Sequence, residues 1–229
     1  MPWITALFWS CFITLIAVIL FAALMFVISK STHQDNSADD LATGQTRVMT
    51  TEILAYAASV NNAIVQMQQS GATPDQIDFM LPDDTNFNTA PTLYKLFHPD
   101  GGGLNYKPLP ARAVADSGGT PQAGYYVGRF NSVEWTPTTA HDIVFTAYKL
   151  SESVCKDINR KLTGSATIPV VSGESLENLF VWDHLHSGTN ANFMVTQCAA
   201  CEDVAALCVG DGAGKYAFYS IFNYFQNYY

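Results

Sequence analysis

The first 29 residues of this 229-residue chain carry no charged side chain, so all 11 basic and 20 acidic residues lie in residues 30–229. This stretch is almost wholly apolar, with only a few small polar residues. As a helix, the apolar run from Trp3 to Ile28 would span about 39 Å, more than the roughly 30 Å hydrocarbon core of a bilayer. The sequence therefore predicts a membrane-spanning helix over residues 1–29, followed by one polar domain.

The predicted anchor is rich in large apolar side chains, which would face lipid or neighbouring helices. A cleaved secretory signal peptide is the alternative interpretation. Signal peptides begin with a basic region and have an apolar core of about 7–15 residues, and this segment has neither property. We therefore expect a permanent anchor that also serves as an assembly helix, carried by Trp3, Phe8, Phe12, Leu15, Ile19, Leu24 and Phe26.

Four of the five cysteines fall in the polar domain: Cys155, Cys198, Cys201 and Cys208. An even number of cysteines behind an export-capable segment favours disulfides in an oxidising compartment. One bridge from Cys155 would tie its helix to the 198–208 region, and the other would close a small local loop. Three pairings remain open from sequence alone. We predict that the domain is periplasmic or extracellular.

A long amphipathic helix is predicted directly after the anchor, over about residues 37–70. Its apolar residues recur at steps of three and four, which is the spacing of one helical stripe. Gly71 is a suitable helix stop, and Thr73-Pro74 fits the start of a short helix. The stripe consists of Met49, Ile53, Tyr56, Val60, Ile64 and Met67.

The rest of the domain combines loops, strands and one shorter helix. Prolines and glycines interrupt every regular pattern in residues 81–122, whereas residues 125–135, 143–150 and 216–225 are rich in β-branched and aromatic residues. Between the last two runs, Ser151 and Gly164 fit the N-cap and the stop of a helix with an apolar face of Val154, Ile158 and Leu162. The predicted fold class is α+β, with the long helix packed on a small antiparallel sheet.

Two metal sites are possible alternatives. Cys198, Cys201 and Cys208 with His184 and His186 have ligand types that zinc prefers, but the spacing lacks two close pairs, so disulfides are favoured. Asp84, Asn86 and Asn88 have the 1, 3, 5 spacing of a calcium loop. Position six is Thr89 instead of Gly, and position twelve is Lys95 instead of Glu, so the loop is not an EF-hand. An irregular calcium site is the weaker alternative to a solvated turn.

No complete catalytic or phosphate-binding motif is present. Residues 173–177 lack the final Gly of a nucleophile elbow, and residues 210–215 are one residue short of a phosphate loop. Asp183, His184 and His186 are tied to no nucleophile by a recognisable motif. The net charge of -9 also argues against a nucleic-acid partner, because nucleic-acid binding relies on clustered Lys and Arg. We therefore predict a protein that is not an enzyme and that needs no cofactor.

The order of an apolar helix, an amphipathic helix, a loop region, antiparallel strands and late cysteines resembles type IV pilins and type II secretion pseudopilins. Residues 55–60 (AYAASV), residues 154–162 (VCKDINRKL) and the Tyr/Phe-rich end are similar to prepilin-like envelope proteins of Gram-negative bacteria. The stretch from Met1 to Ile28 contains neither Gly nor Glu, so the resemblance does not extend to the family's processing site.

The resemblance implies a non-enzymatic, membrane-anchored subunit of a pilus-like or pseudopilus-like assembly, whose partners are the membrane and other pilin-like subunits. Its globular part would be periplasmic or extracellular. The alternative is a tethered binding module that captures a ligand in the loops of residues 82–122. Exposed aromatic side chains such as Phe87, Tyr94 and Tyr106 would make the contacts in that case.

Overall fold

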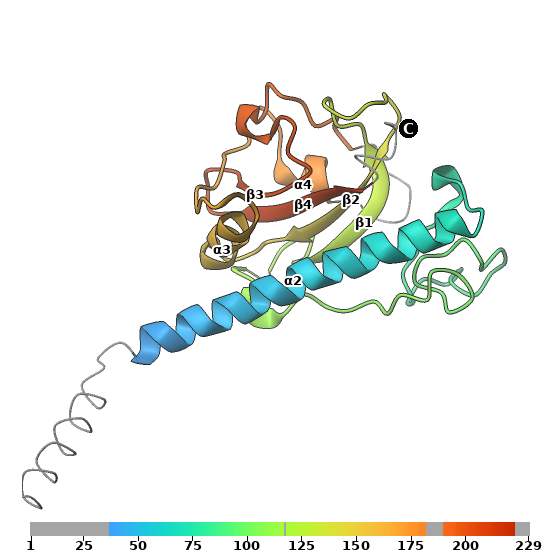
Figure 1. Ribbon diagram of the computed structural model, residues 1–229, viewed down its shortest axis with the longest axis horizontal. Helices are drawn as coiled ribbons and strands as arrows, with labels where there is room; N and C mark the ends of the chain where they lie inside the picture. Colours follow the sequence, from blue (N-terminus) through green and yellow to red (C-terminus); the bar gives the residue numbers. More distant parts are fainter. Residues whose placement is uncertain (1–36, 117, 182–189, 223–229) are drawn as a thin grey trace, which may run out of the picture. The chain divides into compact units, whose positions relative to one another are not determined.

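The computed structural model describes residues 37–116, 118–181 and 190–222 (Figure 1). The predicted anchor of residues 1–29 lies outside them, and none of the described helices is long and apolar enough to cross a membrane. The chain divides into two compact units, Met1–Gly44 and Gln45–Tyr229. The second unit contains all four strands of the sheet.

A four-stranded antiparallel sheet forms the centre of this unit (Figure 1). Its order is β1-β2-β4-β3, so β4, the last strand along the chain, lies between β2 and β3. Tyr125 pairs with Ala147, and Thr146 pairs with Tyr219. The strands are β1 (Gly124–Asn131), β2 (Asp142–Tyr148), β3 (Ala206–Gly210) and β4 (Tyr216–Phe222).

Three of these strands match the predicted β-rich runs, but no pattern in the sequence predicted β3. It is only 5 residues long and is followed by a turn containing Gly212 and Gly214, both with positive φ. So short a run shows no clear period of its own. Pairing with β4 makes it a strand.

Helix α2 (Ser37–Gln69) covers one face of the sheet with the predicted stripe. Ile53, Val60 and Ile64 have no exposed surface. The ring of Tyr56 lies 4.7 Å from that of Tyr125 and 6.0 Å from that of Phe145, measured between centroids. The predicted helix, its stop near Gly71 (φ 100°) and the short 3₁₀ helix at Pro74–Gln76 are all confirmed.

Helix α3 (Glu152–Thr163) packs on the same face of the sheet as α2 (Figure 1). It follows Ser151 and ends at Gly164, whose φ of 80° and N–H bond to the Arg160 carbonyl form a C-cap. Val154 and Ile158 are fully buried, as predicted. The prediction for Leu162 is wrong because its side chain is 41% exposed. The last turn of α3 contacts the polar side of α2 through Lys161 instead of packing on the sheet.

The opposite face of the sheet is covered by the short helix α4 (Leu176–Phe180) and by residues near Phe193. The Phe180 ring stacks on that of Tyr219 at 5.3 Å with an interplanar angle of 2°, and Phe193 meets the same ring edge-on. Apolar layers therefore lie on both faces. The α+β class with a small antiparallel sheet and long loops is confirmed. Two further 3₁₀ turns are Ala111–Ala113 and Ala199–Cys201.

Candidate functional site

Two disulfides use all four cysteines of the polar domain. Cys155 is bonded to Cys208 across 53 residues, and Cys198 is bonded to Cys201 within one turn. This confirms that Cys155 ties its helix to the 198–208 region and that the second bridge is local. No thiolate is left for zinc among these four, and no group of three or more potential metal ligands occurs in the described ranges. His184 and His186 lie outside those ranges.

Asn159 provides a second connection between α3 and β3. No pattern in the sequence predicted this connection. Its side chain is fully buried, and its Oδ1 accepts a hydrogen bond from the Cys208 N–H at 2.8 Å. Its Nδ2 donates to the Cys208 carbonyl at 2.7 Å and to the Thr167 carbonyl at 2.8 Å. The amide thus pairs with the strand backbone as a neighbouring strand would. A polar residue four positions after a buried cysteine, on the same helix face, was the available signal.

The candidate calcium loop holds a cation that belongs to the chain. The side chain of Lys95 is buried, and its Nζ donates to the carbonyls of Asn86 (2.5 Å), Phe87 (2.8 Å) and Thr89 (2.6 Å). Asp84 Oδ1 accepts instead from the Asn86 N–H at 2.8 Å. Carbonyls that a calcium ion would need are therefore bound to an ammonium group. Asn88, the third predicted ligand, lies in the same loop.

Lys95 also explains why one prediction of the binding hypothesis is wrong. Phe87 was expected to be an exposed ligand contact, but it is only 8% exposed and its ring packs 5.1 Å from that of His98. The loop closes over the Lys95 ammonium and carries Phe87 inward. Tyr94 is partly buried, and Tyr106 is 37% exposed.

Glu177, Tyr148 and Lys215 form an electrostatic cluster between α4, β2 and the turn before β4. Lys215 Nζ lies 2.7 Å from Glu177 Oε1, and the Tyr148 hydroxyl donates to the same oxygen. Burial alone would raise the pKa of Glu177, but these two hydrogen bonds outweigh it and lower the pKa to about 2. Burial and the bond to Glu177 raise the pKa of Tyr148.

These shifts keep Glu177 ionised and Tyr148 protonated at neutral pH. General acid–base catalysis needs a group whose pKa lies near the working pH, so the cluster is suited to structure and not to proton transfer. Ser175, the centre of the incomplete nucleophile motif, is the N-cap of α4, where its Oγ accepts from the Asn178 N–H at 3.1 Å. Asp183, His184 and His186 lie outside the described residues.

A hollow with a volume of about 410 Å³ lies beside the end of α2. Its wall includes Met67, Leu93, Tyr94, Asp100 and Gly102, which mixes apolar, aromatic and carboxylate groups. The volume is within the range of small-molecule sites. Tyr125 lines two smaller hollows of about 140 and 120 Å³.

Helix α2 itself offers an exposed apolar surface. Leu41 is 66% exposed and Val48 is 67% exposed, whereas the stripe from Ile53 onward is buried against the sheet. Leu41 lies in the first unit and Val48 in the second, and each is an exposed aliphatic residue of α2. Leu41, in the first unit, is the candidate assembly contact of α2. The predicted assembly residues of the anchor lie outside the described ranges.

No protein-family model, curated protein or solved structure matches this chain. The similarity to pilins and pseudopilins therefore remains a prediction from the sequence.

Proposed function

We propose that the chain is a membrane-anchored, non-enzymatic structural subunit of a pilus-like or pseudopilus-like envelope assembly. Helix α2 is the observation that carries the proposal. It is a single helix of 33 residues, it follows a charge-free apolar segment in the sequence, and its later turns form one wall of the core. Such a helix can hold a folded domain on an assembly of packed helices.

The domain has the rigidity that this role requires. The Cys155–Cys208 bridge and Asn159 fix α3 to an outer strand of the sheet, and both α2 and α3 rest on the same face. Apolar helices gain about 25 cal/mol for each Å² of apolar surface that leaves water. Copies packed side by side through α2 and the predicted anchor would bury Leu41 and its neighbours. Assembly would then need neither a catalytic centre nor a cofactor.

Site-specific photo-crosslinking of the full chain in membranes tests this proposal. A photoreactive amino acid replaces Leu41 in one variant and Val170 in a matched control, because both side chains are large, aliphatic and exposed (66% and 55%). We expect dimers and larger species after irradiation of the Leu41 variant and only monomer from the Val170 variant. Electron microscopy of sheared cell-surface material then examines whether the crosslinked species form filaments.

Two results would count against assembly through α2. One is monomer from both variants at native expression level. The other is equal crosslinking from both positions, which would indicate collision without a specific surface.

A tethered binding module is the second candidate function, and the hollow of about 410 Å³ favours it. In that case the full chain would remain monomeric and a small ligand would saturate the hollow. Ligand-observed NMR on the full chain and on a Leu93→Trp variant, which narrows the hollow, separates specific from general binding.

A further inference from the structure

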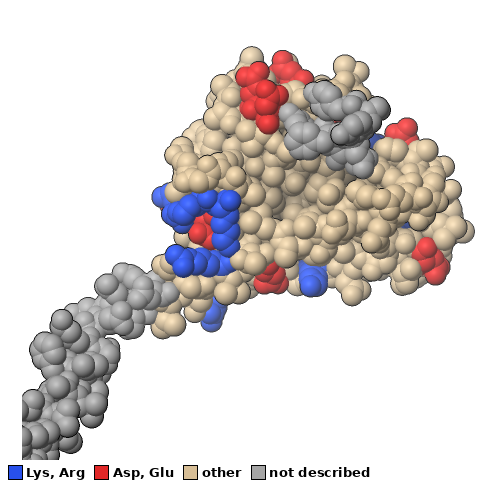
Figure 2. Space-filling model, in the orientation of Figure 1, with Lys and Arg blue, Asp and Glu red and all other residues tan. Residues whose placement is uncertain are grey.

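Four basic side chains form one surface on a strongly acidic chain. Arg47 comes from α2, and Lys156, Arg160 and Lys161 come from α3; together they are named the α3 basic surface. Figure 2 shows that the Lys and Arg atoms on the visible face gather chiefly in one place, around a carboxylate. Two other lysines, Lys95 and Lys149, are buried and donate to backbone carbonyls.

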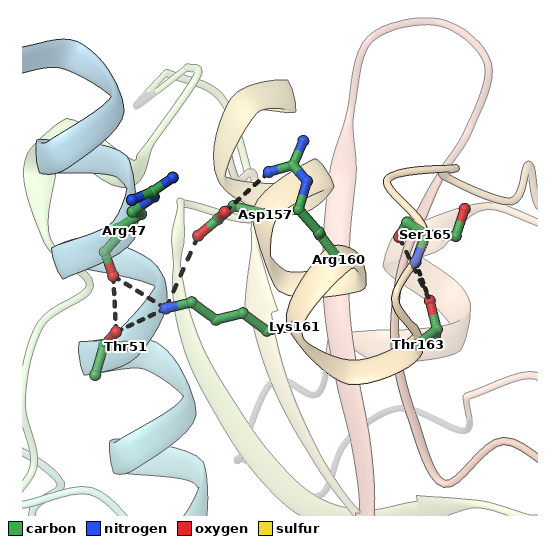
Figure 3. Close-up of polar contacts among 7 residues, drawn as sticks. All are labelled: Arg47, Thr51, Asp157, Arg160, Lys161, Thr163 and Ser165. Carbon is green, nitrogen blue, oxygen red and sulfur yellow. Dashed lines mark hydrogen bonds and ion pairs between the residues drawn. The ribbon is translucent and has the colours of Figure 1, made fainter. Parts of the chain in front are cut away.

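The α3 basic surface is held in place by contacts between α2 and α3 (Figure 3). Lys161 Nζ donates to Thr51 Oγ1 at 2.7 Å and to the Arg47 carbonyl at 3.3 Å. Asp157 lies beneath, with its side chain 8% exposed; Oδ1 is 3.0 Å from Arg160 Nη1 and Oδ2 is 3.9 Å from Lys161 Nζ. One nearly buried carboxylate thus orders two cations without shielding them from solvent.

The surface has a local positive charge. Its four cations face two carboxylates, Asp157 and Glu152, so the local sum is +2, against -9 for the whole chain. A hydrogen bond from Lys156 to Glu152, at 2.6 Å, raises the pKa of that lysine, which therefore stays charged at neutral pH. The side chains of Lys156 and Arg160 are 47% and 58% exposed. Their charge is available to a ligand.

Exposed aliphatic residues occur on the same two helices as these cations. Leu162 follows Lys161 and is 41% exposed, and Val48 follows Arg47 and is 67% exposed. Lys and Arg beside exposed aliphatic groups are typical of surfaces that bind lipid, because the cations attract phosphate and the aliphatic groups enter the acyl boundary. A protein partner with carboxylates would pair with the cations but would leave the aliphatic groups without a matching contact.

Along the chain, the surface also lies close to the residues that lead to the predicted anchor. The folded unit begins at Gln45, and Arg47 is two residues further on, so the surface adjoins the point at which the amino-terminal residues join the unit. From these observations we infer that the α3 basic surface binds the phosphate groups of anionic lipids in the membrane that holds the predicted anchor. This inference rests on the membrane attachment in the proposed function.

The test uses the full chain reconstituted in vesicles of phosphatidylcholine alone or mixed with phosphatidylglycerol. Flotation reports attachment of the anchor. A fluorescent amino acid at the exposed position of Ser165, next to α3, reports contact of the surface through quenching by nitroxide-labelled lipid headgroups. We expect flotation in both vesicles but strong quenching only in the anionic ones, weakened by salt because salt screens exposed charges.

The test variant is Lys156→Gln/Arg160→Gln, and the matched control is Lys107→Gln/Arg112→Gln, which changes the net charge equally from -9 to -11. Lys107 and Arg112 are exposed and lie outside α2 and α3. Because each cation near an anionic surface contributes about 1 kcal/mol, we expect the test variant to lower the ratio of docked to undocked domain about 30-fold. The control should match the unmodified chain.

The outcomes separate this inference from the proposed function. Two outcomes would overturn lipid binding by the surface but leave membrane attachment by the anchor intact. One is flotation with equal quenching in both kinds of vesicle. The other is an equal loss of quenching in the test and control variants. Flotation without quenching, together with crosslinking of α3 to a second copy, would assign the surface to protein carboxylates and also overturn it. A chain that does not float would contradict membrane attachment and the inference with it.

Discussion

Two regions of the domain are held together by different chemistry. In the first, α3 is fixed to β3 by a disulfide between Cys155 and Cys208 and by the buried amide of Asn159. In the second, the loops of residues 77–104 are ordered around the Lys95 ammonium and the close turn at Gly101 and Gly102. The first region is constrained covalently, and the second depends on one buried charge surrounded by carbonyl dipoles.

The difference predicts different sensitivities. A disulfide stabilises mainly by restricting the unfolded chain, so its effect depends on the length of chain that it closes and on redox conditions. A buried ammonium stabilises through hydrogen bonds in the folded state, and its loss leaves acceptors without donors. Reductants should lower the stability of the first region. The stability of the second region should fall only when Lys95 is substituted.

The largest effect is expected from removing the long bridge with Cys155→Ala/Cys208→Ala. Closing a loop of 53 residues contributes about 4 kcal/mol to the free energy of unfolding in the chain-entropy treatment. The control Cys198→Ala/Cys201→Ala opens a bridge with a separation of 3 and should cost about 2 kcal/mol. Urea unfolding monitored by circular dichroism measures both. Equal losses would show that loop length does not set the contribution.

A smaller effect is expected from Lys95→Met, which keeps the apolar stem and removes the ammonium. Three carbonyls lose their donor, and the free energy of unfolding should fall by about 3 kcal/mol under both oxidising and reducing conditions. Lys107→Met, at an exposed position, is the control and should be neutral. An unchanged unfolding midpoint would mean that water replaces the ammonium.

The same measurement tests the calcium alternative. Because the carbonyls of residues 86, 87 and 89 already hold Lys95, excess calcium should not raise the unfolding midpoint of the unmodified chain. A calcium-dependent rise that Asp84→Asn abolishes would instead support an irregular site at Asp84, Asn86 and Asn88.

The smallest effect is expected on the stability of the folded chain at low pH. The pKa of Glu177 is lowered from 4.5 to about 2, so its contribution is fully present above pH 4.5 and is lost as the pH falls toward 2. Glu177→Gln should remove that part of the acid sensitivity, whereas Glu202→Gln, at an exposed position, serves as the control. Unfolding midpoints measured across this interval check the prediction. Parallel profiles for the unmodified chain and Glu177→Gln would contradict it.

Much of the fold follows from local sequence patterns. The stripe from Met49 to Met67 predicted α2, and Ser151 with Gly164 bounded α3, because helix periodicity and capping depend on residues a few positions apart. Strand β3 was missed because five residues carry too little periodicity. Leu162 was misplaced because a helical stripe says which residues share a face but not where the neighbouring element ends.

The candidate surfaces were harder to predict. Lys95 appeared as a wrong residue in a calcium loop, but its inward direction depends on a loop that folds back over it. Phe87 was expected to be an exposed contact of the loops, and the same loop closure buries it. Asn159 acts on Cys208, 49 residues away, through contacts that no local pattern encodes.

The sequence by itself determined the charge-free amino-terminal segment, the two longer described helices, most of the strands and an even set of cysteines in the polar domain, since these depend on composition and short-range periodicity. Only the tertiary structure decided which cysteines pair, that Lys95 points inward, and that Arg47 and Lys161, 114 positions apart, share one surface. The physical reason is that such contacts arise from chain reversals between elements, and their geometry is fixed by packing against the sheet.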